Sequence, residues 1–192
     1  WHLLSNPFGH QLKKWVELFD LSCICFHDLS SSFEVRFKEH ICQTPHFKKI
    51  QSEYKNIEQF THEEYVHYRL DAEQSLGLNP EIYRVFIQEK PDVVILPSAL
   101  LDYFTDDVLQ ITDAFHIPTF LIVAGWDNLS SKGLLFHKPT MIGVWGQQSA
   151  NHAREIQQIP SDRIVILGAP HLEPYFYSRE LGNTIKKEKS KT

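Results

Sequence analysis

The chain has 192 residues, of which 42% are hydrophobic and 22% are charged. This length and composition are typical of a soluble globular protein with one well-packed domain. The formal net charge of -5 argues against a nucleic-acid-binding protein, which normally carries an excess of basic residues. No apolar run reaches the roughly 20 residues that a membrane-spanning helix needs, and no secretory signal is visible, so we expect a cytoplasmic protein. Because the sequence begins at Trp1 rather than Met, we expect its natural start to lie upstream.

The N-terminal segment has the pattern of a strand, a helix and a second strand. Leu3–Ser5 is predicted to end the first strand, and the turn Asn6–Gly9 leads into a helix over His10–Asp20. Leu21–Phe26 is predicted as the second strand. The helix would turn its apolar residues inward, namely Leu12, Trp15, Val16 and Phe19.

Three cysteines occur in this half of the chain: Cys23, Cys25 and Cys42. An odd number without framework spacing indicates reduced thiols. Cys23 and Cys25 are two residues apart in the predicted strand, so both would lie on the same side and act as small buried apolar groups. A metal site would need more ligands at compatible spacing, and we therefore predict no metal and no cofactor.

Helices are predicted to follow. Asn56–Gly77 has the composition of one or two helices with a polar face. Asn79 and Pro80 then mark the start of another helix, since proline is tolerated at the first helical position. This helix would present Ile82, Val85 and Phe86 on adjacent turns.

From Lys90 to Pro170 short apolar strands alternate with helices. The predicted strands are Val93–Leu96, Thr119–Ala124, Met141–Trp145 and Arg163–Leu167. The first connecting helix would run from a cap at Thr105 to about Phe115, with Val108, Ile111 and Phe115 as its inward stripe. The region Gly125–Pro139 is predicted as a loop. The second connecting helix would start at Ser149 or Asn151 and stop before Pro160.

This alternation predicts an α/β fold with a Rossmann-like, doubly wound parallel sheet. The predicted domain covers residues 1–176, and residues 177–192 form a polar, lysine-rich tail. The lysines of the tail are compatible with peripheral association with a membrane. Ligands of such sheets bind at the carboxyl ends of the strands.

The most distinctive stretch follows the strand Thr119–Ala124 directly and therefore lies at the predicted ligand edge. It offers an aromatic ring, a carboxylate, an amide, two hydroxyls and an amine, from Trp126, Asp127, Asn128, Ser130, Ser131 and Lys132. A ligand with many hydroxyl groups needs such a set of donors and acceptors. The alternative interpretation is structural: Asp127 and Asn128 would form an Asx-turn, and Ser130 would cap a short helix.

The order of several motifs resembles the N-terminal domain of bacterial GT-B-type glycosyltransferase-like proteins. The resemblance covers about Lys90 to Phe176 and rests on their spacing. The motifs are Gly125-Trp126-Asp127-Asn128-Leu129-Ser130-Ser131-Lys132-Gly133, Val144-Trp145, and Ile159-Pro160-Ser161-Asp162-Arg163-Ile164-Val165-Ile166-Leu167-Gly168-Ala169-Pro170. Gly125 replaces the serine that such proteins often have, and Gly146-Gln147 replaces Asn-Glu.

The resemblance implies a transferase that builds a glycan or surface polymer, related to CDP-glycerol transferases and sugar-nucleotide epimerases. The N-terminal domain of such enzymes usually binds the glycan or lipid-linked acceptor, and the C-terminal domain binds the nucleotide-sugar donor. Only residues 171–192 follow Pro170, too few for a donor domain. We therefore expect the donor half to be missing or to be a separate subunit, and the isolated chain to be inactive.

Three further positions complete the predicted site. His10 is the last residue of Asn6-Pro7-Phe8-Gly9-His10, a segment that resembles the Pro-x-x-Gly-His turn of some inverting GT-B enzymes. The resemblance implies that His10 is the catalytic base, and Asp127 is the second predicted catalytic residue. The alternative for His10 is a surface or capping role. Ser98 and Gly168 follow two other strands at the same edge and are predicted to contact substrate. Helix capping explains Ser98 equally well.

Three common catalytic patterns are absent: Gly-x-Gly-x-x-Gly, the phosphate-binding Gly-x-x-x-x-Gly-Lys-Ser/Thr, and Gly-x-Ser-x-Gly. Their absence argues against a self-contained dinucleotide enzyme, a nucleoside triphosphatase and a serine hydrolase. A non-catalytic subunit that recruits a catalytic partner remains the alternative from another class, and it predicts a large exposed apolar patch.

Overall fold

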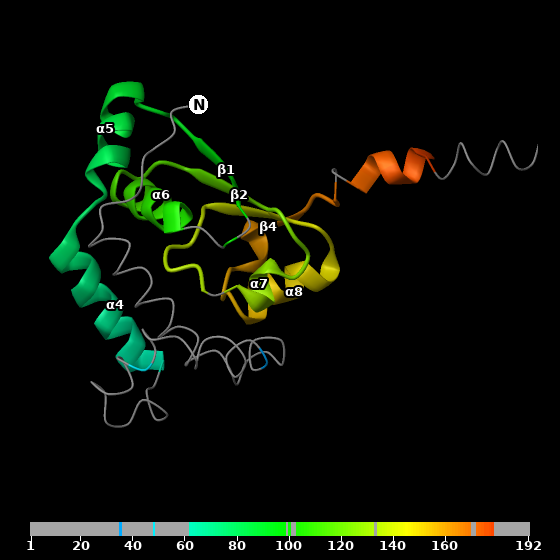
Figure 1. The fold of residues 1–192 in the computed structure, drawn as a ribbon, viewed down its shortest axis with the longest axis horizontal. Coiled ribbons are helices and arrows are strands. Elements are labelled where there is room, and N and C mark those ends of the chain that lie inside the picture. Colours follow the sequence, from blue (N-terminus) through cyan, green and yellow to red (C-terminus); the bar gives the residue numbers. More distant parts are fainter. Residues whose placement is uncertain are drawn as a thin grey trace, which may run out of the picture.

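The computed structural model describes residues 62–98, 100, 103–132, 134–169 and 172–178, together with Val35 and Lys48. A four-stranded parallel sheet in the order β1-β2-β3-β4 lies at its centre (Figure 1). The strands are β1 (Val94–Ser98), β2 (Thr119–Val123), β3 (Met141–Val144) and β4 (Ile164–Ile166). Each overlaps one predicted strand, which confirms the α/β class and the parallel sheet.

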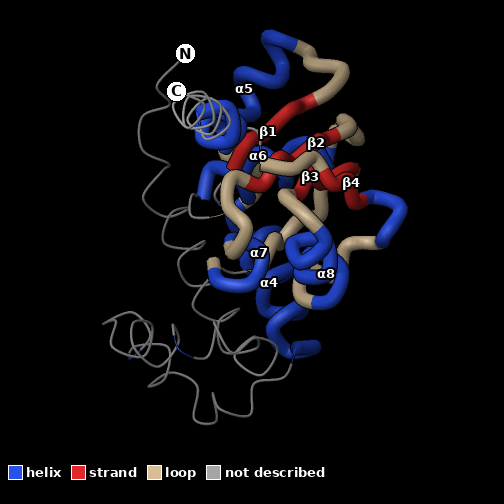
Figure 2. The backbone as a smooth tube through the Cα atoms, turned by 90° about the vertical axis from the view of Figure 1, so that its right-hand side faces the viewer, coloured by secondary structure: helices blue, strands red, loops and turns tan. Residues whose placement is uncertain are grey.

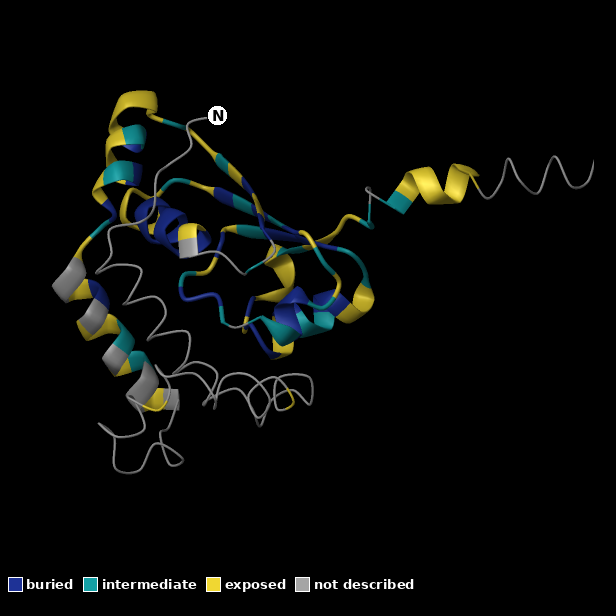
Figure 3. Ribbon diagram, viewed as in Figure 1, coloured by how far each residue is buried: buried dark blue, intermediate teal, exposed yellow. Residues whose placement is uncertain are grey.

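Helices precede and connect these strands. They are α4 (His62–Leu76), α5 (Pro80–Glu89), α6 (Tyr103–Ala114), α7 (Asn128–Ser131) and α8 (Gln147–Glu155), with a 3-10 turn η3 (Ser161–Arg163) before β4. A further helical segment, residues 173–178, is exposed along its whole length (Figure 3). None of the helices in the described part of the chain is both long and apolar enough to cross a lipid bilayer.

Helix α5 begins as its sequence predicts. The Oδ1 atom of Asn79 accepts hydrogen bonds from the backbone N–H groups of Glu81 and Ile82, and Pro80 occupies the first turn. The Nδ2 atom of Asn79 also donates to Oδ2 of Asp107, 2.7 Å away. The side chain of Asn79 therefore caps α5 and joins it to α6, because Asp107 lies in the first turns of that helix.

Helix α6 ends close to its predicted end but differs from the prediction at its start and in the exposure of Phe115. It begins at Tyr103, so Thr105 lies inside the helix rather than at its cap. Val108 and Ile111 are buried as predicted, but Phe115 is 38% exposed, and its predicted inward position is wrong. The reason is that α6 ends at Ala114 and the chain then turns through His116, whose φ of 57° lies in the left-handed region. Phe115 instead packs beside the ring of Tyr83, with 5.6 Å between the ring centroids.

The predicted loop Gly125–Pro139 contains the short helix α7, and in this respect the prediction is wrong. Helix α8 starts at Gln147, two residues earlier than the first of the two predicted starts. Its N-cap is Gly146, which has no side chain with which to signal a helix start. The helix ends before Pro160, as predicted.

The two faces of the sheet have different environments. The register places Leu96, Leu121 and Ile142 side by side on one face, and all three are buried. They share a core with side chains from the three connecting helices, namely Val108, Leu109, Ile111, Leu129, Ala150 and Ala153. Figure 2 shows α7 and α8 together on one side of the strands. The helix-covered face of the sheet therefore holds the core of the described residues.

The opposite face, which we call the open face, is apolar as well. Its members are Ile95, Pro97, Phe120, Ile122, Met141 and Val165. None of them belongs to the buried core of the described residues. In the described sheet each strand lies next to the one that follows it in the chain, from β1 to β4. Right-handed crossovers between strands added in one direction place all of the connecting helices on a single face of the sheet.

Candidate functional site

The candidate site is the edge of the sheet where the parallel strands end. Ser98, the turn after Val123, the turn after Val144 and Gly168 all lie at these carboxyl ends. Ala124 extends the pairing by one hydrogen bond, from its backbone N–H to the carbonyl oxygen of Ser98. The fold therefore brings together the ends of strands that are up to 70 residues apart in the sequence, from Ser98 to Gly168.

Gly125 allows the chain to turn tightly after β2. A Cβ atom at this position would lie 2.6 Å from Oδ1 of Asn128, whose side chain is buried at 5% exposure. The Asn128 amide therefore packs directly on the glycine backbone. This contact gives a physical reason why a residue without a side chain stands at this position.

Asp127 organises helix α7 through two of its oxygen atoms. Its backbone carbonyl oxygen accepts hydrogen bonds from the hydroxyls of Ser130 at 3.1 Å and Ser131 at 2.9 Å. Its carboxylate accepts a second bond from Ser131, at 3.0 Å. Although Asp127 is the N-cap residue, its side chain makes no capping hydrogen bond. Both serine hydroxyls thus stabilise the turn, but Ser130 lies inside α7 and does not cap it as the structural alternative predicts.

The predicted site residues differ in how far solvent can reach them. Asn128 and Ser130 are buried, and Trp126 is 56% exposed. Asp127, Ser131 and Lys132 are partly exposed. Lys132 forms no ion pair with any residue that the structure describes. A ligand at this edge would therefore meet the indole of Trp126 and the charged groups of Asp127 and Lys132 first.

Ser98 is held at the end of β1 by its own contacts. Its Oγ atom lies 2.7 Å from Oγ1 of Thr105 and accepts a hydrogen bond from the backbone N–H of Leu100. The residue is 4% exposed. Gly168 has a φ of +79°, a conformation that favours glycine, and open space surrounds the position of a Cβ atom there. His10 and the three cysteines lie outside the described residues.

Three side chains that the sequence analysis did not predict as site residues hold the loop in place. The indole Nε1 of Trp145 donates to the carbonyl oxygen of Val123 at 3.0 Å. The hydroxyl of Ser149 donates to the carbonyl oxygen of Trp126 at 3.1 Å. These bonds tie the end of β3 and the start of α8 to the turn after β2.

Gln157 is the third of these side chains and is completely buried. Its Nε2 atom donates to the carbonyl oxygen of Leu129 at 2.9 Å, and its Oε1 atom accepts from the backbone N–H of Leu135 at 2.8 Å. No local pattern around Gln157 signals this role, because both partners are more than 20 residues away.

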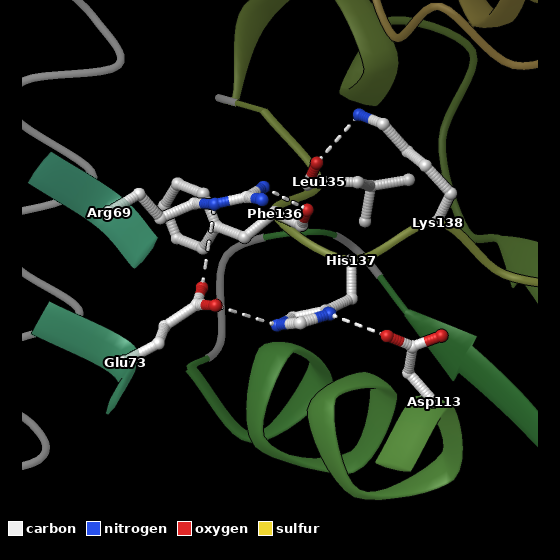
Figure 4. A network of polar contacts seen from close by, with 7 residues as sticks. All are labelled: Arg69, Glu73, Asp113, Leu135, Phe136, His137 and Lys138. Carbon is white, nitrogen blue, oxygen red and sulfur yellow. Dashed lines mark hydrogen bonds and ion pairs between the residues drawn. The ribbon is translucent and has the colours of Figure 1, made fainter. Parts of the chain in front are cut away.

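A second polar cluster joins α4 to α6 and to the segment before β3 (Figure 4). His137 bridges two carboxylates: its Nε2 atom is 3.2 Å from Glu73 and its Nδ1 atom is 3.5 Å from Asp113. Arg69 pairs with Glu73 at 3.6 Å and donates to the carbonyl oxygen of Phe136. The cluster fixes α4 against the body of the domain, away from the candidate site.

The described residues also border a cavity of about 270 Å³ at the opposite end of the sheet. Its wall includes Asp113, Thr119, Lys138 and Thr140, which lie near the amino ends of β2 and β3. Thr119 and Thr140 form two reciprocal hydrogen bonds, in which each hydroxyl accepts from the other residue's backbone N–H. The position argues against a ligand cavity of the usual α/β kind.

Lys138, in the segment before β3, has a lowered pKa. Desolvation by the surrounding protein lowers its pKa to about 8, the positive charge of Arg69 lowers it further, and Asp106 opposes the shift. Its Nζ atom donates to the carbonyl oxygen of Leu135 at 2.7 Å, while much of the side chain remains accessible to solvent.

Among the described residues, no group of three or more His, Cys, Asp or Glu side chains could hold a metal ion. No protein-family model, no curated protein and no solved structure matches this chain.

Proposed function

We propose that this chain is the acceptor-binding half of a GT-B-type glycosyltransferase, which transfers a sugar from a nucleotide-sugar donor to a glycan or surface-polymer acceptor. Two things support the proposal: the motif resemblance and the position of one stretch in the fold. The most distinctive stretch of the sequence, Gly125–Gly133, begins at the carboxyl end of a central parallel strand, where ligands of open α/β sheets bind.

The accessible groups of this stretch suit an acceptor with many hydroxyl groups. Trp126 offers an indole face on which a sugar ring can stack, and Asp127 offers a carboxylate that accepts hydrogen bonds from hydroxyls. Lys132 would stabilise phosphate charge once the cleft closes. Asn128 and Ser130 are buried and would maintain the shape of the turn. The proposed base, His10, lies outside the described residues.

The four described strands would be one part of a Rossmann-like, doubly wound sheet within a domain over residues 1–176. A second domain or subunit would bind the nucleotide-sugar, without a metal or other cofactor. We place the reaction in the cytoplasm, with lipid-linked acceptors drawn from the inner face of the membrane.

A second candidate function belongs to a different class. A non-catalytic subunit that recruits a catalytic partner needs an exposed apolar surface, and the open face of the sheet is such a surface in the described residues: Ile95 is 61% exposed and Val165 is 36% exposed. A CDP-glycerol transferase or an epimerase-like enzyme shares the proposed fold and would differ in the donor half.

Titration calorimetry with a panel of nucleotide-sugars tests the proposal. The same panel is titrated into the 192-residue chain and into the product of the extended gene. We expect binding by the extended protein and no binding by the chain alone. Tight binding by the chain alone would contradict the proposal, because a complete donor site would then exist without a second domain.

A matched pair of variants tests the acceptor role of the loop. In the extended protein, Trp126→Ala is expected to lower kcat/KM for the acceptor at least tenfold and to leave donor binding unchanged. Tyr83→Ala removes another exposed aromatic ring, on α5, and is the control. Equal activity of the two variants would overturn the acceptor role. Loss of partner binding on Ile95→Asp but not on Trp126→Ala would instead favour the recruiting subunit.

A further inference from the structure

Two threonine hydroxyls in the wall of the cavity at the amino ends of β2 and β3 have an unused donor. Thr119 is 4% exposed, and its Oγ1 atom accepts a hydrogen bond from the backbone N–H of Thr140 at 2.8 Å. Thr140 accepts in return from the N–H of Thr119 at 3.1 Å. A hydroxyl also carries one O–H donor, and neither of these hydroxyls donates to a residue that the structure describes. Both O–H groups can therefore donate to a molecule in the cavity.

Lys138 adds a positive charge to the same wall. Its amine has three hydrogens, of which one is donated to the carbonyl oxygen of Leu135 at 2.7 Å (Figure 4). The amine forms no ion pair with any carboxylate in the described part of the chain. Burial and, after it, the positive charge of Arg69 lower the pKa of Lys138, and Asp106 opposes this only in part. An anion in the cavity would compensate this charge.

Asp113 also borders the cavity, but its negative charge is largely screened. Its side chain is 72% exposed, and its carboxylate lies 3.5 Å from Nδ1 of His137. Water around an exposed carboxylate weakens its repulsion of an anion, because charges interact weakly in a medium of high dielectric constant. Asp113 therefore does not close the cavity to an anionic ligand.

The size and the remaining walls of the cavity limit the ligand. Its volume of about 270 Å³ is at the lower end of the range for small-molecule sites. Leu109, Ile117 and Pro118 supply apolar surface beside the polar groups. The side chains of Lys138 and Thr140 are exposed, so the cavity is accessible from solvent. These features fit an anionic group that is attached to a short carbon skeleton.

We propose that this cavity binds the phosphate group of a small phosphorylated metabolite, and that Thr119, Thr140 and Lys138 donate hydrogen bonds to it. A phosphate monoester has three terminal oxygens that all accept hydrogen bonds, which match two hydroxyls and one amine. A carboxylate has only two such oxygens. The cavity lies at the amino ends of the strands, whereas substrates of open α/β sheets bind at the carboxyl ends, so the ligand would act as an effector. The inference holds whichever reaction the domain serves.

Competitive labelling of the full chain tests the proposal at single lysines. The chain is treated with acetic anhydride near pH 8, where part of the Lys138 population is neutral, and mass spectrometry measures the rate at each lysine. We expect inorganic phosphate to slow the acetylation of Lys138 at least fivefold relative to potassium chloride of equal ionic strength, and to leave Lys90 unchanged. Unchanged labelling of Lys138, or equal protection by formate, would overturn the proposal. Protection of Lys132 instead would place the phosphate at the candidate site and would also overturn it.

Variants then identify the donors, with phosphorus NMR as the measure of affinity for inorganic phosphate. Thr140→Val removes one O–H donor at nearly constant volume, and Thr140→Ser keeps it. We expect a dissociation constant at least tenfold higher for Thr140→Val and for Lys138→Met, and one within twofold of the unsubstituted chain for Thr140→Ser. Lys90→Met is the control for the loss of one positive charge, because Lys90 is exposed at the end of α5. Circular dichroism shows that each variant is folded. Equal affinity of Lys138→Met and Lys90→Met would contradict the proposed site.

Discussion

The indole nitrogen of Trp145 donates a hydrogen bond to the backbone carbonyl oxygen of Val123, across 3.0 Å. Val123 is the last residue of β2, and Trp145 follows the last residue of β3. The bond therefore joins two neighbouring strands just where the candidate loop departs. A side chain thus supplies the interaction that backbone pairing no longer supplies beyond the ends of the strands.

Trp145→Phe removes this donor and leaves the Val123 carbonyl oxygen with one hydrogen bond fewer. We expect the free energy of unfolding to fall by about 1–2 kcal/mol, as for other unpaired buried groups. Urea unfolding measures the change. Trp126→Phe is the control, since that indole is 56% exposed and should change stability by less than about 0.5 kcal/mol. Equal effects of the two substitutions would show that the bond contributes nothing.

Gly125→Ala tests the contact between the turn and Asn128. The added methyl group would lie 2.6 Å from Oδ1 of a buried amide, so we expect a loss of about 1–3 kcal/mol from overpacking. Gly146→Ala is the matched control, because no atom lies within 4 Å of its Cβ position and its φ of -173° is extended backbone.

A double-mutant cycle separates this contact from general strain. If Asn128 is the obstacle, the loss caused by Gly125→Ala becomes smaller when Asn128→Ala is already present. Additive losses in the double variant would mean that the turn itself rejects a side chain. Urea unfolding of the four proteins gives the coupling energy.

Local signals in the sequence predict much of this fold. The cap of α5 follows from Asn79 and Pro80 alone, because both the cap and the first-turn proline act within three residues. The strands follow from short apolar runs. Boundaries fail where no local signal exists: Gly146 has no side chain to mark the start of α8, and Phe115 lies beyond a helix end that the apolar spacing does not show.

The candidate site was harder to predict than the fold, because its contacts join distant residues. Ser98 pairs with Thr105 across a turn, and Gln157 reaches Leu129 and Leu135 from more than 20 residues away. Asp107 appears in the sequence as an acidic residue near a helix start, yet it is buried against Asn79. Such pairs exist only after the chain has folded, so spacing along the sequence does not reveal them.

Gln157→Leu keeps the volume of a buried side chain and removes both of its hydrogen bonds. The carbonyl oxygen of Leu129 and the N–H of Leu135 each lose a partner, at about 1–3 kcal/mol per buried group, so we expect a total loss of about 2–6 kcal/mol. Gln148→Leu, at an exposed position of α8, should be nearly neutral. The proposed role of Gln157 fails if thermal or urea unfolding finds its variant as stable as the control.

Lys138 predicts how stability depends on pH. Its pKa is about 8 in the folded chain and 10.5 in the reference state, so the unfolded chain binds the proton more tightly. Stability therefore rises with pH between about 8 and 10.5, and below pH 8 the charged amine opposes folding. Because much of the side chain is exposed to solvent, we expect a small slope.

Lys138→Met isolates this effect. The substitution removes the titrating amine, so the stability of the unsubstituted chain relative to the variant should increase as the pH is raised from 7 to 10. Other groups that titrate in this range do so in both proteins and cancel in the difference. The lost hydrogen bond to Leu135 adds only a constant offset. Urea unfolding at several pH values measures the difference. A difference that stays constant from pH 7 to 10 would show that folding does not change the proton affinity of Lys138, whereas a decrease would mean that the folded chain binds this proton more tightly.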